Sequence, residues 1–195
     1  AFNEVAAAIA DHPMPIIMDS CCGTGFSSRK IAEQHPHAWV VGLDRSAKRL
    51  SKEDQHPLPR NCLMAQVDCI DFWKLAVNAG WSLEKHFLLY PNPYPKSVQL
   101  KTRWHGHPAF TDILRLGGIL EVRSNWKIYI EEFSQALIIA GQQNTGCEAF
   151  EPQGLADSGG NNPAEGYLTL FERKYHQSGQ GLYRCLSSLS FGNTR

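Results

Sequence analysis

The chain has 195 residues, no net charge at neutral pH and 43% hydrophobic residues, which suits one globular domain over residues 1–195. No apolar run approaches the roughly 18 residues of a membrane span, and no signal-peptide pattern opens the chain. Six cysteines without CxxC or zinc-ligand spacing argue against a disulfide scaffold and a metal site. We therefore expect a cytoplasmic protein with reduced thiols and neither membrane nor metal partners, as a monomer or homodimer.

The first part of the chain alternates predicted helices with predicted buried strands. We expect a helix at 2–10, a strand at 15–18, a helix at 29–34 and a strand at 38–43. The small residues from Asp19 to Gly25 form a turn between the first strand and its helix. Such a turn lets backbone amides approach a ligand, although it can also be purely structural. No Gly-Lys-Ser/Thr follows, which excludes a P-loop, and the third glycine of a dinucleotide fingerprint is missing.

Carboxylates end the second and third predicted strands. Asp44 can accept both hydroxyls of a ribose, or instead cap a helix predicted at 46–54. A third strand at 61–67 ends at Asp68, which can accept from a purine amino group or cap the following helix. Together with the small-residue turn, these carboxylates favour an adenosine cofactor that carries no phosphate.

The segment after the fourth predicted strand, residues 86–90, has proline at positions 91, 93 and 95. These prolines exclude a helix and force the residues before them into extended backbone. Asn92 and Tyr94 are thereby held at the carboxyl edge of the sheet, where ligands bind in open α/β folds. We expect this segment to form a wall of the active site.

Strands and helices continue to alternate in the second half. The expected elements are a helix ending at 114–116, a strand at 119–123, a helix at 126–140, a strand at 148–150, a mobile loop at 151–166 and a last strand at 167–172. This order predicts a doubly wound α/β sheet, mostly parallel, with an antiparallel last strand.

Two segments contain basic residues and no acid. One runs from Pro91 to Thr111, and the other follows Glu172. If they meet in space they form a patch for phosphate; otherwise they are two solvated loops. Their basic residues include Lys96, Lys101, Arg103 and Lys174.

The turn and the strand ends resemble those of the class I S-adenosylmethionine-dependent methyltransferases. More narrowly, residues 15–184 resemble the bacterial tRNA (guanine-N7-)-methyltransferases. That family has an acidic residue followed by alternating glycines. Asp19, Gly23 and Gly25 match it, and Cys21 replaces the first glycine.

The more specific motifs lie later in the chain. The family's Pro-Asp-Pro-Trp and basic segment are matched at 91–103, with Asn92 and Tyr94 as substitutions. Its Thr-Asp-Trp is matched at 124–126, with Asn125 for Asp. Its Thr-x-Phe-Glu is matched at 169–172. Three separated motifs in the family's order are a much stronger signal than any one of them.

The resemblance implies a Rossmann-like methyltransferase sheet and methyl transfer from S-adenosylmethionine to N7 of a guanine in tRNA. It implies three overlapping groups of site residues. The catalytic group is Asn92, Tyr94 and Glu172. The cofactor-binding group is Asp19, Cys21, Gly23, Gly25, Asp44, Arg45, Asp68, Cys69 and Asn92. The substrate-binding group is Lys96, Lys101, Arg103, Asn125, Thr169, Glu172 and Lys174.

The two Asp-to-Asn substitutions leave the target base open. Guanine's N1–H and N2–H₂ donors suit a carboxylate, whereas adenine suits the amide of Asn92. Asn92-Pro93-Tyr94 is also similar to the Asn-Pro-Pro-Tyr motif of N6-adenine methyltransferases. The sequence is compatible, in addition, with a catalytically decayed cofactor- or RNA-binding protein and with an NAD-dependent oxidoreductase.

Overall fold

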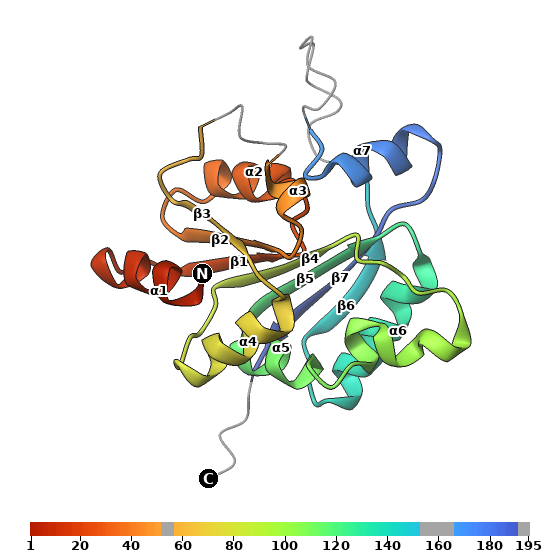
Figure 1. Ribbon diagram of the computed structural model, residues 1–195. Helices are drawn as coiled ribbons and strands as arrows, with labels where there is room; N and C mark the ends of the chain where they lie inside the picture. Colours follow the sequence, from red (N-terminus) through yellow and green to blue (C-terminus); the bar gives the residue numbers. More distant parts are fainter. Residues whose placement is uncertain (52–56, 153–165, 191–195) are drawn as a thin grey trace.

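A seven-stranded sheet forms the centre of the computed structural model, which describes residues 1–51, 57–152 and 166–190 (Figure 1). The strands are β1 Ile16–Ser20, β2 Trp39–Asp44, β3 Cys62–Gln66, β4 Lys85–Leu89, β5 Gly118–Ser124, β6 Thr145–Ala149 and β7 Tyr183–Leu189. Their order in the sheet is β3-β2-β1-β4-β5-β7-β6. Strands β1 to β5 pair in parallel, and β7 pairs antiparallel with β5 and β6. The predicted mostly parallel sheet with an antiparallel last strand is confirmed.

Helices cover both faces of this sheet (Figure 1). The α-helices are α1 Phe2–Asp11, α2 Phe26–Gln34, α3 Ala47–Leu50, α4 Cys69–Asn78, α5 Phe110–Leu116, α6 Lys127–Ile139 and α7 Leu170–Gln177. Two short 3-10 helices, η2 Ser97–Thr102 and η3 Trp104–Gly106, follow the proline segment. None of the described helices is long and apolar enough to cross a membrane.

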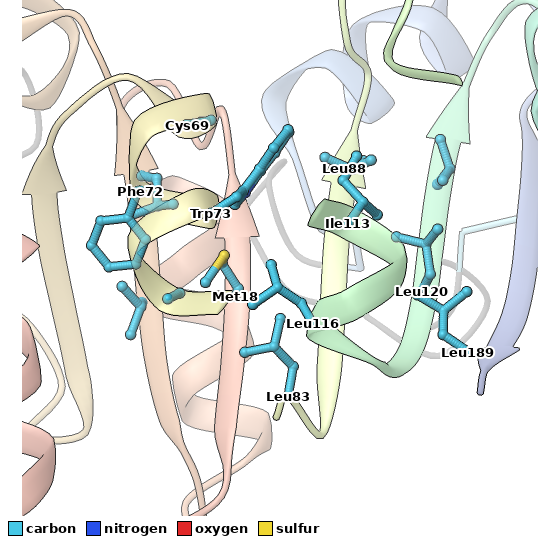
Figure 2. Packing of buried hydrophobic residues seen from close by; sticks show 14 of the residues in the cluster. Met18, Cys69, Phe72, Trp73, Leu83, Leu88, Ile113, Leu116, Leu120 and Leu189 are labelled. Carbon is cyan, nitrogen blue, oxygen red and sulfur yellow. The ribbon is translucent and has the colours of Figure 1, made fainter. Parts of the chain in front are cut away.

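The central strands β1, β2 and β4 are buried on both faces, because helices cover both sides of the sheet and successive side chains of a strand point to opposite sides. On one face, Met18 and Leu88 belong to a large cluster with Trp73 of α4 and Ile113 of α5, as Figure 2 shows. On the other face, Ile17 belongs to a smaller cluster with residues of α2. A charged residue in one of these strands therefore faces one of the two helical layers. Its odd or even position along the strand decides which layer it faces.

Up to residue 50 the expected elements are present, although α2 begins at Phe26, three residues before its expected start. The helix expected at 46–54 begins as the four-residue α3, and residues 52–56 lie outside the described part of the chain. The sixth strand begins three residues earlier than expected. Most of the loop expected at 151–166 also lies outside the described residues.

The last strand expected at 167–172 is wrong, because this segment leads into α7. Thr169 is the N-cap of that helix, and its hydroxyl accepts a hydrogen bond from the Glu172 amide at 2.9 Å. Thr-x-x-Glu is a capping pattern, which outweighs the short apolar run around it. The antiparallel last strand is β7, where Cys185, Ser187 and Leu189 alternate as buried residues.

Candidate functional site

A tight loop joins β1 to α2 at the carboxyl edge of the sheet. Cys21, Gly23 and Gly25 have φ angles of 62°, 66° and 83°. Glycine adopts this left-handed backbone freely, whereas Cys21 is strained in it. A Cβ on Gly25 would lie 2.6 Å from the flexible end of the Met64 side chain, which would have to move, and the positive φ of Gly25 disfavours any larger residue.

The loop is open on its outer side. A Cβ on Gly23 would meet no atom within 4 Å among the described residues. The helix behind the loop, α2, begins after Gly25 without a side-chain cap. Its first amides are therefore donors for a ligand placed against the loop.

Asp44 holds this loop to the second strand. The carboxylate is 2% exposed, and its Oδ2 accepts from the Gly23 amide at 2.9 Å. Its Oδ1 accepts from the Ser46 amide and from Nη2 of Arg49, both at 2.8 Å. Ser46, not Asp44, supplies the side-chain cap of α3. A ribose at Asp44 would have to replace or join Arg49, whose own side chain is 51% exposed.

Asp19, predicted to bind the cofactor, lies beneath the loop. It is 0% exposed, and its Oδ2 accepts from the hydroxyls of Ser27 and Ser28 at 2.6 and 2.7 Å. Asp19 points to the α2 side because it shares a strand face with Ile17. Burial raises the pKa of its carboxyl to about 6, although the two serine hydroxyls lower it. Asp19 therefore supports the loop through Oδ2, and its buried Oδ1 has no hydrogen-bond partner among the described residues.

The segments that follow β1 and β3 also meet at this edge. Cys69, the first residue of α4, has its Sγ 3.6 Å from Sγ of Cys21. The hydrogen bond with Cys21 and burial both raise the pKa of the Cys69 thiol. Asp68 caps α4 by accepting from the Ile70 amide at 2.9 Å. This cap is one of the two roles expected for Asp68. The residue itself is exposed. Arg45, directly after β2, is exposed beside them.

These features fit an adenosine ligand. The uncapped α2 amides, the open side of Gly23 and the buried Asp44 carboxylate lie together. Cys69 and the exposed Asp68 border the same place through the contact with Cys21.

The proline segment after β4 is strained at both ends. Tyr90 and Tyr94 have φ angles of 52° and 44°, which bulky residues rarely adopt. Between them, Asn92 is exposed, and its amide oxygen accepts from the Tyr94 amide at 3.2 Å. The NH₂ of Asn92 is therefore the branch that faces outward.

Arg103, predicted to bind phosphate, anchors this segment from inside. It is 5% exposed, donates from Nε and Nη2 to the Tyr94 carbonyl, and forms an ion pair with Glu132. The phosphate role therefore does not fit Arg103. Lys96 and Lys101, from the same basic segment, are exposed.

Glu172, predicted to be catalytic and to bind substrate, is sealed inside the protein. It is 1% exposed and accepts from Tyr90 Oη at 3.2 Å, Arg123 Nη1 at 2.9 Å and the Leu168 amide at 3.0 Å. These bonds fasten α7 to the ends of β4 and β5. Glu172 thus positions the site and does not touch a base in this arrangement.

An ion-pair chain that the sequence reasoning missed continues from Glu172 across the sheet. Arg123 pairs with Glu121 at 2.6 Å, and Glu121 pairs with Lys85 at 2.7 Å. Burial alone would raise the pKa of Glu121, but the two cations hold it below its usual range. Glu121 and Arg123 are two apart in a strand, and this spacing indicated a shared face.

The remaining predicted substrate residues differ in position. Thr169 is 7% exposed and is used as the cap of α7, so its hydroxyl does not face a substrate. Asn125 joins the end of β5 to the turn after α7 by donating to Gln180 Oε1 at 2.8 Å. Lys174 is exposed on α7.

No three His, Cys, Asp or Glu side chains gather as possible metal ligands within residues 1–51, 57–152 and 166–190. All six cysteines carry free thiols.

Residues 13–185 match the sequence model of a family described as "Putative methyltransferase", so the chain belongs to this methyltransferase family. It is 26% identical, over 86% of its length, to a tRNA (guanine-N(7)-)-methyltransferase of Nocardia farcinica. It is 25% identical, over 91% of its length, to a protein of the same description from Treponema pallidum. The chain spans 65% and 68% of the length of these two relatives.

Solved structures of methyltransferases share the fold. The 16S rRNA methyltransferase KamB superposes with a TM-score of 0.63 at 17% identity, covering 97% of this chain and 94% of that one. A 16S rRNA (adenine(1408)-N(1))-methyltransferase from Catenulisporales acidiphilia, with bound cosubstrate, gives a TM-score of 0.64 at 15% identity, covering 100% and 94%. The expected Rossmann-like methyltransferase sheet is therefore confirmed.

Proposed function

We propose that this chain transfers a methyl group from S-adenosylmethionine to N7 of a guanine in tRNA. The observation that carries the proposal is the meeting of three separated motif segments at one edge of the sheet. Residues 91–96, 124–126 and 169–172 follow β4, follow β5 and begin α7, and Glu172 ties these elements together. The relatives from Nocardia and Treponema support the same substrate.

The loop after β1 and the two following strand ends are the proposed cofactor site. The amides of the loop and of α2 would receive the polar groups of the methionine part, and Asp44 would accept from the ribose. Asp68 and Cys69 would border the adenine. S-adenosylmethionine, when bound, supplies an electrophilic methyl group on a sulfonium.

Methylation of guanine N7 needs no general base, because N7 is unprotonated at neutral pH. The protein's task is to hold the base in line with the methyl group, and positioning of this kind contributes roughly 7–11 kcal/mol to barrier reduction. The strained proline segment suits this task. Tyr90 and Tyr94 fix its ends, and Glu172 and Arg103 fix them in turn.

The hydrogen bonding of Asn92 is compatible with guanine. The amide oxygen accepts from the Tyr94 amide, and its second lone pair leaves it able to accept from adenine N6 as well. The outward NH₂ is a donor, and guanine has the O6 acceptor beside N7. Adenine methylation is the second candidate because Asn92 replaces the family's Asp.

Tritiated-methyl transfer to unmodified tRNA transcripts, followed by nucleoside analysis, tests the proposal. We expect 7-methylguanosine, and none from a transcript made with 7-deazaguanosine, which has no N7 to methylate. S-adenosylhomocysteine should bind in calorimetry, and NAD should not. Cofactor binding without any 7-methylguanosine would refute the guanine proposal, and methyladenosine would establish the second candidate.

Asn92→Asp distinguishes a working site from a decayed one. We expect methylation to fall, because the variant exchanges the outward donor for an acceptor. A large gain in methylation would instead show that the natural Asn92 has weakened the reaction.

A further inference from the structure

Three aromatic rings follow one another from the end of β4 along α7. The rings of Tyr90 and Tyr175 have their centroids 5.7 Å apart with an interplanar angle of 34°. Tyr175 and Phe171 follow at 6.1 Å and 20°, in a stacked arrangement. The outer ring, Phe171, is 53% exposed.

The described core does not account for the two outer rings. Neither Phe171 nor Tyr175 belongs to the two hydrophobic clusters found among the described residues. The helix is instead fastened by the buried Glu172 and by Leu168, which packs in the smaller cluster. Phe171 and Tyr175 therefore do not hold α7 against the described hydrophobic core, and they lie outside it.

One cation lies beside these rings. Nζ of Lys174 is 5.7 Å from the Tyr175 ring centroid, and Arg173 lies on the same helix two residues from each outer ring. The single acidic residue in α7 is Glu172, which is buried against Arg123. Aromatic faces combined with cations suit an unpaired nucleotide, because the base stacks while the phosphate is neutralised.

The series of three rings also begins, at Tyr90, next to the proposed target site. Tyr90 directly precedes the segment of Asn92, and its hydroxyl bonds Glu172 of α7. We propose that Phe171 and Tyr175 form a stacking site for an unpaired RNA base next to the target nucleotide. The site rests on the proposed function for its RNA substrate, but its binding is measured without methylation.

Phe171→Ala tests the site, with Leu170→Ala as the control because Leu170 is a neighbouring exposed residue of α7. Fluorescence anisotropy with unmodified tRNA should show about tenfold weaker binding for Phe171→Ala and little change for Leu170→Ala. Phe171→Trp should retain the affinity, whereas Phe171→Leu, which is apolar but cannot stack, should not. S-adenosylhomocysteine affinity should be the same in all four variants.

Photocrosslinking provides a second measurement. Irradiation of the complex with tRNA that contains 5-iodouridine should attach RNA to a peptide carrying Phe171 or Tyr175. Binding of Phe171→Ala within twofold of wild type, or equal rescue by Leu and Trp, would overturn the stacking site.

The same variants separate this inference from the proposed function. If Phe171→Ala binds and methylates tRNA as well as wild type does, the stacking site alone is overturned. Loss of tRNA binding in Phe171→Ala, when the wild-type protein forms no 7-methylguanosine, would support the stacking site and refute the methylation proposal alone.

Discussion

The two sides of the candidate site are built in different ways. On the cofactor side (Cys21–Gly25, Asp44, Asp68 and Cys69), the central bond joins Gly23 to Asp44, 21 positions apart. On the target side (Tyr90–Lys96, Arg123 and Thr169–Glu172), Glu172 bonds residues 82 and 49 positions away. The cofactor side thus depends mainly on backbone turns, with one long-range contact between Cys21 and Cys69, whereas the target side depends on a buried network assembled from distant segments.

The largest expected effect is on the target side. Glu172→Gln keeps the side-chain shape but removes the buried carboxylate from Arg123 and Tyr90. Because breaking a buried ion pair typically costs about 3–5 kcal/mol, and Arg123 keeps Glu121, we expect the free energy of unfolding to fall by about 3 kcal/mol. Urea denaturation measures this loss.

An exposed Glu–Arg pair provides the control for that variant. Glu148→Gln breaks the pair with Arg184, in which Glu148 is 54% exposed, and should cost less than about 1 kcal/mol. Equal losses in the two variants would contradict the view that the buried network holds the target side together.

On the cofactor side, Asp19 should make stability depend on pH. Burial raises its pKa from the ordinary 3.8 to about 6, so the folded state holds the proton more tightly than the unfolded chain. The free energy of unfolding should therefore fall as pH rises from about 4 to about 6, by up to about 3 kcal/mol. Asp19→Asn cannot titrate, so its stability relative to wild type should rise through this window and level off above it. Parallel stability profiles from urea denaturation at stepped pH would contradict the assignment.

Asp44→Asn should weaken cofactor binding, with an energetic effect smaller than the stability changes expected for Glu172→Gln and Asp19→Asn. The amide cannot replace a carboxylate that accepts from Gly23, Ser46 and Arg49. Hydrogen bonds to charged groups contribute about 1.5–3 kcal/mol, so S-adenosylhomocysteine should bind about 30-fold more weakly in calorimetry. Asp68→Asn, which retains a good N-cap, should change the affinity less. Unchanged affinity in Asp44→Asn would place the ribose elsewhere.

The smallest effect is expected from the exposed cations. Lys101→Ala should weaken tRNA binding about threefold and lower the salt slope by about 1, because a phosphate contact contributes nonspecifically. Lys48→Ala, an exposed change on α3 of the cofactor side, should alter neither. Equal effects of the two substitutions would show that tRNA does not favour the target side.

The turn and the strand ends of the cofactor side were predictable because their signals are local. Small residues after a buried strand indicated the tight turn, and a carboxylate at the end of the next strand indicated Asp44. Asp19 was expected among the cofactor-binding residues, and the structure places it on the buried face of Ile17 and α2, as strand alternation requires. The sequence allowed two roles for Asp68, capping a helix or contacting a purine. The structure shows the capping contact.

The target side was less predictable for physical reasons. The segment 167–172 combines a short apolar run with a capping pattern, and the cap decided its structure. The burial of Arg103 depends on Glu132, which a distant helix supplies without a local signal. The bonds of Glu172 to Tyr90 and Arg123 likewise exist only after β4, β5 and α7 have come together.

The position of β7 has a consequence for folding during synthesis. This strand is the last one along the described part of the chain, yet it lies between β5 and β6. Until Tyr183–Leu189 has been made, β6 has no partner and β5 has one open edge, and open edges invite wrong pairing. Strands β1 to β4, by contrast, find all their partners in segments that emerge before β6. The order of synthesis therefore completes the cofactor side first and closes the target side last.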